Sequence, residues 1–245
     1  MASKARPLIL ALETATRAGS VCLARGPEVL ARLAGSASLS HSTDLIENLE
    51  ELLRSEHLKL SDVDLFAAAS GPGSFTGLRI GLATVKSLAV CARRSCVGIS
   101  TLAASAHSAG ASAGTVAILP AGRGEVFAQV FEVNEDEVRP LDAPAHLRPK
   151  ALLEKYGSFR ELKWVGEEEL LRQTLPAEEL KPPAVWSLRT SSNELAVSIA
   201  ALALRDLANG NVISPEELRA TYVRPSDAEI NEQWQSPRTT GPVSI

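Results

Sequence analysis

The chain has 245 residues, of which 45% are hydrophobic and 22% charged, and its formal net charge at pH 7 is −4. This length and apolar content are typical of a globular protein with one large domain or two lobes, and they argue against disorder. A negative net charge argues against RNA binding by this chain alone, because counterion release from nucleic acid needs a positively charged protein.

The cysteine content predicts a reducing environment. Cys22, Cys91 and Cys96 are odd in number and form no Cys-x-x-Cys pair, so we expect reduced thiols and a cytoplasmic location. The first apolar run stops at Glu13 and lacks a cleavage-like end, which argues against a signal peptide. We also expect no segment of membrane-spanning length and no membrane association.

The N-terminal part of the chain predicts three strands. Residues 8–12 are continuously apolar and are typical of a buried strand that runs into a polar turn at Glu13. Residues 20–25 and 28–33 flank Gly26-Pro27 and predict a hairpin.

An amphipathic helix is predicted from residue 44 onward. Its apolar positions follow the helical period and include Leu45, Leu49 and Leu52. Another apolar run, residues 65–69, predicts the next strand.

The most unusual local sequence is the run Gly71-Pro72-Gly73-Ser74-Phe75-Thr76-Gly77. Glycines this close together are tolerated where φ must be positive or where another group must approach the backbone closely. Free amides at the start of the next helix, with the hydroxyls of Ser74 and Thr76, would also suit an anion. The spacing fits neither a P-loop nor a dinucleotide-binding fingerprint. The run therefore predicts either an anion site or a structural turn.

The helix that follows the glycine run carries small residues along one side, which would let another helix approach closely. Its members are Ile80, Ala83, Thr84, Ser87, Leu88 and Cys91. Arg79 lies in the first turn of the same helix. It predicts either a ligand for phosphate or carboxylate, or a salt bridge that fastens the turn.

The second half of the chain predicts another strand-rich unit. Residues 115–119 and 125–133 are typical of strands, and the acidic tract 132–137 predicts a solvated turn rather than a ligand site. Two helix starts are predicted near the end, one by the capping box Ser191-x-x-Glu194 and one by Ser214-Pro215-Glu216-Glu217.

This order of elements resembles a lobe of an actin-like or sugar-kinase-like protein, and six short segments carry a closer resemblance. They are Glu13-Thr14-Ala15-Thr16, His41-Ser42, residues 70–81, Gly98-Ile99-Ser100-Thr101-Leu102, Gly124-Glu125-Val126-Phe127 and Tyr222-Val223-Arg224. On these segments, which follow one another across nearly the whole chain, the sequence resembles the TsaB (YeaZ) family of bacteria.

The resemblance implies an α/β fold of the actin-like/sugar-kinase-like (ASKHA) class, with two lobes that each hold a mixed sheet flanked by helices. The expected domains are an N-terminal lobe at 1–105 and a smaller C-terminal lobe at 106–212. A segment of about 213–235 is expected to pack back on the first lobe, and 236–245 to be a mobile tail.

The function implied by the resemblance is that of a non-catalytic scaffold subunit. Such a subunit belongs to the complex that forms N6-threonylcarbamoyladenosine at position 37 of tRNAs reading ANN codons. Its implied partners are the catalytic paralogue TsaD and the ATPase TsaE, with a homodimer when TsaD is absent and tRNA contact only through the complex. The residues expected to bind the partner are Leu45, Leu49, Leu52, Ile80, Ala83, Thr84 and Ser87.

No metal and no cofactor are expected. TsaD carries a His-x-x-x-His metal pair where this chain has Thr101 and Ser105, and hydroxyls are poor ligands for a soft or borderline metal. Relatives usually have Asp at the position of Glu13, and Asp also at the position of Pro120. Glu13 could hold Mg²⁺ or the amides of its own turn.

An enzyme remains the alternative function. In an ATP-dependent small-molecule kinase or ATPase of the same superfold, Glu13 would hold Mg²⁺. The residues that would then bind phosphate are Gly73, Ser74, Thr76 and Arg79.

Overall fold

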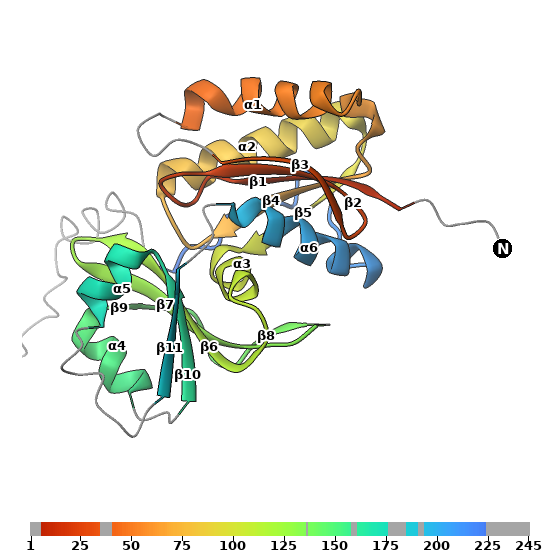
Figure 1. Ribbon diagram of the computed structural model, residues 1–245. Coiled ribbons are helices and arrows are strands. Elements are labelled where there is room, and N and C mark those ends of the chain that lie inside the picture. Colours follow the sequence, from red (N-terminus) through yellow and green to blue (C-terminus); the bar gives the residue numbers. More distant parts are fainter. Residues whose placement is uncertain are drawn as a thin grey trace, which may run out of the picture.

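The computed structural model describes residues 6–34, 41–135, 137–157, 161–175, 185–190 and 194–223, with backbone alone at 41–44 and 185–189. Two sheets, each flanked by helices, form two lobes that meet at a short helix, α3 (Figure 1). The expected tail at 236–245 and Arg224 lie outside the described residues.

The first sheet has five strands in the order β3-β2-β1-β4-β5. Strands β1, β2 and β3 pair antiparallel, whereas β1, β4 and β5 pair parallel. β1 and β4 are buried on both faces, which explains their continuous apolar sequences. This mixed sheet flanked by helices confirms the expected α/β class. The strand bounds are β1 Leu8–Glu13, β2 Ser20–Arg25, β3 Glu28–Ala34, β4 Leu65–Gly71 and β5 Ser95–Ser100.

Helices cover both faces of the first sheet. α1 (His41–Ser55) and α2 (Phe75–Ala92) lie on one face, and α6 (Leu195–Ala208) lies on the other (Figure 1). Alternate residues of β1 serve the two layers: Leu10 packs in the cluster under α1 and α2, and Ala11 packs in the cluster under α6. A 3₁₀ turn, η1 (Leu60–Asp62), precedes β4.

The second sheet has the order β11-β10-β6-β7-β8, with β9 paired to β7. Its core, around Trp164 and Tyr156, lies under α4 and α5, and its other face packs on α3. The bounds are α3 Thr101–Ser108, β6 Ser112–Gly122, β7 Glu125–Val133, β8 Val138–Pro140, β9 Ala145–Leu147, α4 Pro149–Tyr156, β10 Glu161–Gly166, α5 Glu168–Thr174 and β11 Val185–Thr190.

The position of α6 differs from the expected domain boundary, which placed residues 106–212 in the second lobe. α6 packs against β1 and β2 of the first sheet. Its first turn is held there by Ser20 of β2, whose Oγ accepts a hydrogen bond from the Ala196 amide at 3.0 Å. Glu194 occupies the N-cap position without a side-chain cap bond, and Ser191 lies outside the described residues. A strand residue therefore supplies the cap that the local sequence predicted from Ser191.

The helix predicted at Ser214 is wrong. Residues 215–217 form a turn, in which the Ser214 amide donates to Glu217 Oε2 at 3.0 Å. That hydrogen bond lowers the pKa of the Glu217 carboxyl. One of the two hydrogen bonds of a capping box is thus present, but no helix follows it. The chain instead continues along the first lobe, where Leu218 is buried in the core.

α2 requires a correction to the expectation about membrane spans. Among the described helices, α2 is long and apolar enough to cross a membrane, judged by length and composition alone. Its apolar side packs in the core, where Leu78, Val85 and Ala89 are at most 1% exposed.

Candidate functional site

The glycine run lies where β4 ends and α2 begins, and it packs against the turn that follows β1. The Ser74 amide donates to the Ala15 carbonyl at 2.8 Å. Gly73 has φ +158, and a Cβ there would lie 2.6 Å from the Ala15 carbonyl oxygen. Two turns at the carboxyl ends of parallel neighbouring strands are therefore joined backbone to backbone.

Thr14 makes the closest approach in this region. Its hydroxyl donates to the Gly77 carbonyl at 2.8 Å, and its own carbonyl oxygen lies 1.9 Å from where a Cβ on Gly77 would stand. A Cβ on Gly81 would lie 2.2 Å from Thr14 Oγ1. The glycines of the first α2 turns are required by this internal packing. Their presence therefore gives no support to a phosphate cradle.

Glu13 ends β1 as a buried carboxylate, 1% exposed. Its Oε1 accepts from the Thr16 amide at 2.7 Å, and its Oε2 accepts from the Thr16 hydroxyl at 2.6 Å. Both oxygens thus hold the turn after β1. This arrangement corresponds to the second of the two roles considered for Glu13, the stabilisation of its own turn.

The outer surface of the glycine turn is formed by its own side chains, by Arg79 and by Tyr222 from the C-terminal part of the chain. Ser74 and Thr76 are exposed, and Ser74 Oγ caps α2 by accepting from the Gly77 amide at 3.2 Å. The Arg79 guanidinium lies 3.8 Å from the centre of the Phe75 ring. Phe75 in turn contacts Tyr222, with ring centroids 5.3 Å apart. Arg79 thus fastens the turn through a cation–π contact rather than the salt bridge that the sequence suggested.

The positions that correspond to a metal pair in the paralogue are buried. Thr101 and Ser105 lie in α3 and are 0% exposed. Among the described residues, no group of three or more His, Cys, Asp or Glu side chains could hold a metal ion.

Three of the residues expected to bind a partner are wrong for that role. Leu45, Leu49 and Leu52 are 7%, 4% and 1% exposed and belong to the core under α1 and α2. The apolar side chains of α1 are buried against the first sheet, so these side chains cannot contact a second protein in this conformation.

The outer surface of α1 and α2 still carries apolar and small residues. Ile46 is 50% exposed and Val90 56% exposed. Ala83 and Ser87 are exposed as well, with Ile80 and Thr84 partly exposed between them. These four α2 residues belong to the set expected to bind a partner, and Ile46 and Val90 are further exposed apolar residues on the same two helices. We call this set the α1–α2 face: Ile46, Ile80, Ala83, Thr84, Ser87 and Val90.

The motif in the second lobe builds a surface cluster at the start of β7. Glu125 Oε2 lies 2.7 Å from His146 Nε2, and its Oε1 lies 3.4 Å from Arg148 Nε. The His146 ring also packs on Phe127. These contacts tie β9 to β7, which assigns Glu125 a structural role.

The chain is similar in sequence to proteins of a known family. A family model described as TsaD, tRNA N6-adenosine threonylcarbamoyltransferase, matches residues 35–211. The chain is 31% identical over 151 residues to the tRNA threonylcarbamoyladenosine biosynthesis protein TsaB of Escherichia coli strain K12, over 60% of this chain and 65% of that protein. It is 37% identical over 102 residues to TsaB of Haemophilus influenzae, over 41% of this chain and 42% of that protein. The chain belongs to the family of this model, and these curated relatives and its solved YeaZ neighbour are TsaB (YeaZ) proteins.

A solved structure agrees with that assignment. YeaZ from Pseudomonas aeruginosa superposes with a TM-score of 0.73 at 26% identity, over 88% of this chain and 99% of that one. The sequence alignments span less than two thirds of either curated TsaB relative, whereas the structural match spans almost the whole of YeaZ. The family resemblance carried by the short segments is therefore confirmed.

Proposed function

We propose that this chain acts in the biosynthesis of tRNA threonylcarbamoyladenosine as a non-catalytic scaffold subunit in the cytoplasm. In this role it binds the catalytic paralogue TsaD through the α1–α2 face, and the complex recruits the ATPase TsaE. The modified nucleoside is at position 37 of tRNAs that read ANN codons, and tRNA is contacted through the complex.

The observation that carries the proposal is the α1–α2 face. Ile46 and Val90 expose apolar side chains from two adjacent helices, and the exposed residues Ala83 and Ser87 of α2 have little side-chain bulk. Such a surface allows two helices of a partner to approach closely and bury apolar area. TsaD matches the same family model, so a related helix pair on TsaD is a suitable counterpart. A second copy of this chain could occupy the face when TsaD is absent, because a two-fold interface uses the same patch twice.

The geometry of the glycine turn supports a scaffold over a kinase. A phosphate-binding loop must offer free amides and space, but Gly73 and Gly77 are packed against Ala15 and Thr14. The carboxylate of Glu13 is likewise engaged by Thr16. Both features of the kinase alternative are thus used to hold the first lobe together.

Reconstitution tests the proposal. Threonylcarbamoyladenosine on tRNA is measured with TsaD, TsaE and the threonylcarbamoyl donor, with and without this chain. We expect product to depend on the chain, and formation of equal product in its absence would overturn the proposal. Calorimetry of the isolated chain with Mg-ATP is the companion measurement: saturable binding that is lost in Glu13→Gln would favour the kinase.

A single substitution connects the activity to the α1–α2 face. Ala83→Arg places a long cation in the interface, where an unpaired buried charge costs about 3–5 kcal/mol. The matched control is Gln173→Arg, which adds the same charge on the exposed surface of α5. We expect Ala83→Arg to abolish co-elution with TsaD and to lower product, and Gln173→Arg to do neither.

A further inference from the structure

The segment after α6 runs from the first lobe to the second, and we call residues 213–223 the strap. It begins beside the edge strand β5, where Ile213 and Cys96 exchange two backbone hydrogen bonds of 3.0 and 2.9 Å. Leu218 then enters the core of the first lobe and is 1% exposed. The strap is therefore bound to the first lobe by both backbone and side-chain contacts.

The strap crosses the end of β4 at the glycine turn. The Thr221 amide donates to the Ser70 carbonyl at 2.7 Å. A Cβ on Gly71, which has φ +115, would lie 2.5 Å from the Thr221 carbonyl oxygen. The Tyr222 ring then packs on Phe75, which lies under Arg79. The glycine turn is thus held between the β1 turn on one side and the strap on the other.

The strap next reaches the second lobe. Val223 packs against the core cluster between α3 and the second sheet, which contains Leu119 and Phe127. In Figure 1 the blue segment after α6 accordingly passes from the upper sheet toward the lower one. Consecutive residues, Tyr222 and Val223, therefore contact different lobes.

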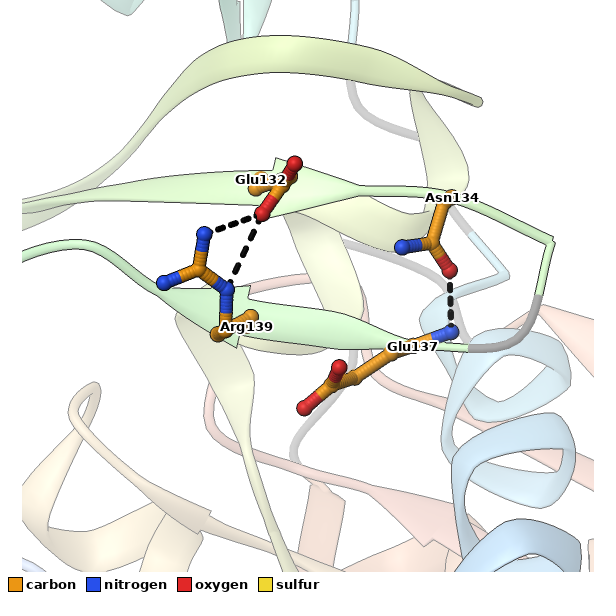
Figure 2. Close-up of polar contacts among 4 residues, drawn as sticks. All are labelled: Glu132, Asn134, Glu137 and Arg139. Carbon is orange, nitrogen blue, oxygen red and sulfur yellow. Dashed lines mark hydrogen bonds and ion pairs between the residues drawn. The ribbon is translucent and has the colours of Figure 1, made fainter.

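In the part of the chain that the structure describes, α3 and the β7–β8 hairpin also join the lobes. α3 packs Ala104 in the first lobe's core and Leu102 in the second lobe's core. The hairpin of β7 and β8 forms the other connection, because Arg205 of α6 donates to the Glu135 carbonyl. Figure 2 shows how this hairpin is stiffened, with Arg139 paired to Glu132 and the Glu137 amide bonded to Asn134 Oδ1 at 2.7 Å.

From these contacts we infer that the strap is a clamp that fixes the angle between the two lobes. Lobes joined by a small interface move relative to one another unless additional contacts hold them. The strap supplies such contacts next to the glycine turn, and α3 supplies a pivot. Release of Tyr222 and Val223 widens the range of angles between the lobes, with α3 as the pivot and the contact of Arg205 with the β7–β8 hairpin as the remaining restraint. The first lobe keeps its own core. The clamp is a property of the fold and holds whether or not the scaffold function is correct.

Spin labels on the two lobes measure this motion. Cys91 is exposed on α2, whereas burial raises the pKa of Cys22 to about 12 and of Cys96 to about 11, so Cys91 is the thiol that labels fast. The second label is attached at Glu154→Cys on exposed α4 of the other lobe. Electron–electron double resonance then gives the distribution of distances between the lobes.

The test compares the parent pair with a release variant, Tyr222→Ala with Val223→Ser, and with a control, Glu216→Gln, on the exposed surface of the strap. We expect one narrow distance distribution in the parent and the control, and a distribution about twofold broader in the release variant. An unchanged width in a release variant that retains its circular dichroism spectrum would overturn the inference.

Hydrogen exchange on the unsubstituted chain tests the clamp independently of any variant. We expect the Thr221 amide to exchange about as slowly as the amides of the glycine turn that it covers, since they open together. Exchange of the Thr221 amide at close to the rate of an unstructured peptide amide would show that the strap is detached most of the time, and would overturn the inference.

Discussion

Thr14 and Gly77 are 63 residues apart in the sequence, and the Thr14 hydroxyl donates to the Gly77 carbonyl at 2.8 Å. The Thr14 carbonyl oxygen lies within 1.9 Å of the site that a Cβ on Gly77 would occupy. The pair joins the turn after β1 to the first turn of α2 so closely that residue 77 must lack a side chain. A motif that looks like a ligand loop in the sequence is thus a structural joint in the fold.

Substitution of Gly77 by Ala tests this joint. The added methyl group would collide with backbone rather than with a flexible side chain, so we expect the free energy of unfolding to fall by about 3 kcal/mol or more. Gly124→Ala is the control: its φ is +73 but nothing lies within 4 Å, so a loss of only about 1–2 kcal/mol is expected. Urea titrations measure both, and equal losses would contradict the close-packing explanation.

A pair of substitutions in α1 separates packing from docking. Leu49→Ala removes a side chain that is 4% exposed, so we expect it to cost about 2–5 kcal/mol of unfolding free energy. Ile46→Ala removes a side chain that is 50% exposed, so the unfolding free energy should change by less than about 0.5 kcal/mol.

Binding to TsaD is expected to show the opposite order. Ile46→Ala should weaken the complex, because Ile46 lies on the α1–α2 face, and the folded fraction of Leu49→Ala should bind normally. Titration calorimetry at a temperature where both variants are folded checks this. A larger binding defect in Leu49→Ala would mean that the buried stripe becomes exposed in the complex.

Much of the fold follows from sequence patterns of short range. The continuous apolar runs predicted β1 and β4, and the helical period predicted α1. The helical period does not show what covers the apolar side of α1, because packing on a sheet and binding to a second protein both require apolar residues at these positions. Burial of Leu49 and Leu52 against the first sheet settled that question.

Contacts between distant residues were beyond the reach of local patterns. Ser20 caps α6 from a strand 176 residues away, and the Thr221 carbonyl rather than a ligand approaches Gly71. The motif around Ser214 has the residues of a helix start, but Leu218 is buried along the first lobe and the chain forms only a turn. In each case tertiary packing decides between outcomes that the local sequence leaves open.

Lys163 of β10 holds the carboxyl end of α3. Its ammonium donates to the carbonyls of Ala109, Gly110 and Ala111 at 3.0, 3.2 and 2.9 Å. Lys163→Met keeps the aliphatic stem and removes these bonds, so we expect the unfolding free energy to fall by about 1–3 kcal/mol. Lys150→Met on exposed α4 is the control and should be nearly neutral. Equal effects in the two variants would show that Lys163 acts through its stem alone.

We expect His107 to make the contact between α3 and α6 sensitive to acid. Its Nδ1 lies 3.1 Å from Ser198 Oγ, and burial together with the nearby Arg205 lowers the pKa of His107 below its ordinary value. When the pH falls below about 6.5, the unfolded chain binds a proton that the folded chain resists, so folding becomes less favourable. Above that pH both states are neutral at this residue, and the contribution is fully present.

The variant His107→Gln should therefore lose less stability than the parent chain between pH 7.5 and pH 5.5, measured by urea unfolding at both values. His57→Gln is the matched control, because His57 is exposed, and it should keep the parent slope. The comparison uses the difference between the two pH values within each variant, so a packing loss common to both pH values cancels. If His107→Gln loses as much unfolding free energy between the two pH values as the parent chain, other groups cause the acid sensitivity. Protonation would then not affect the contact between α3 and α6.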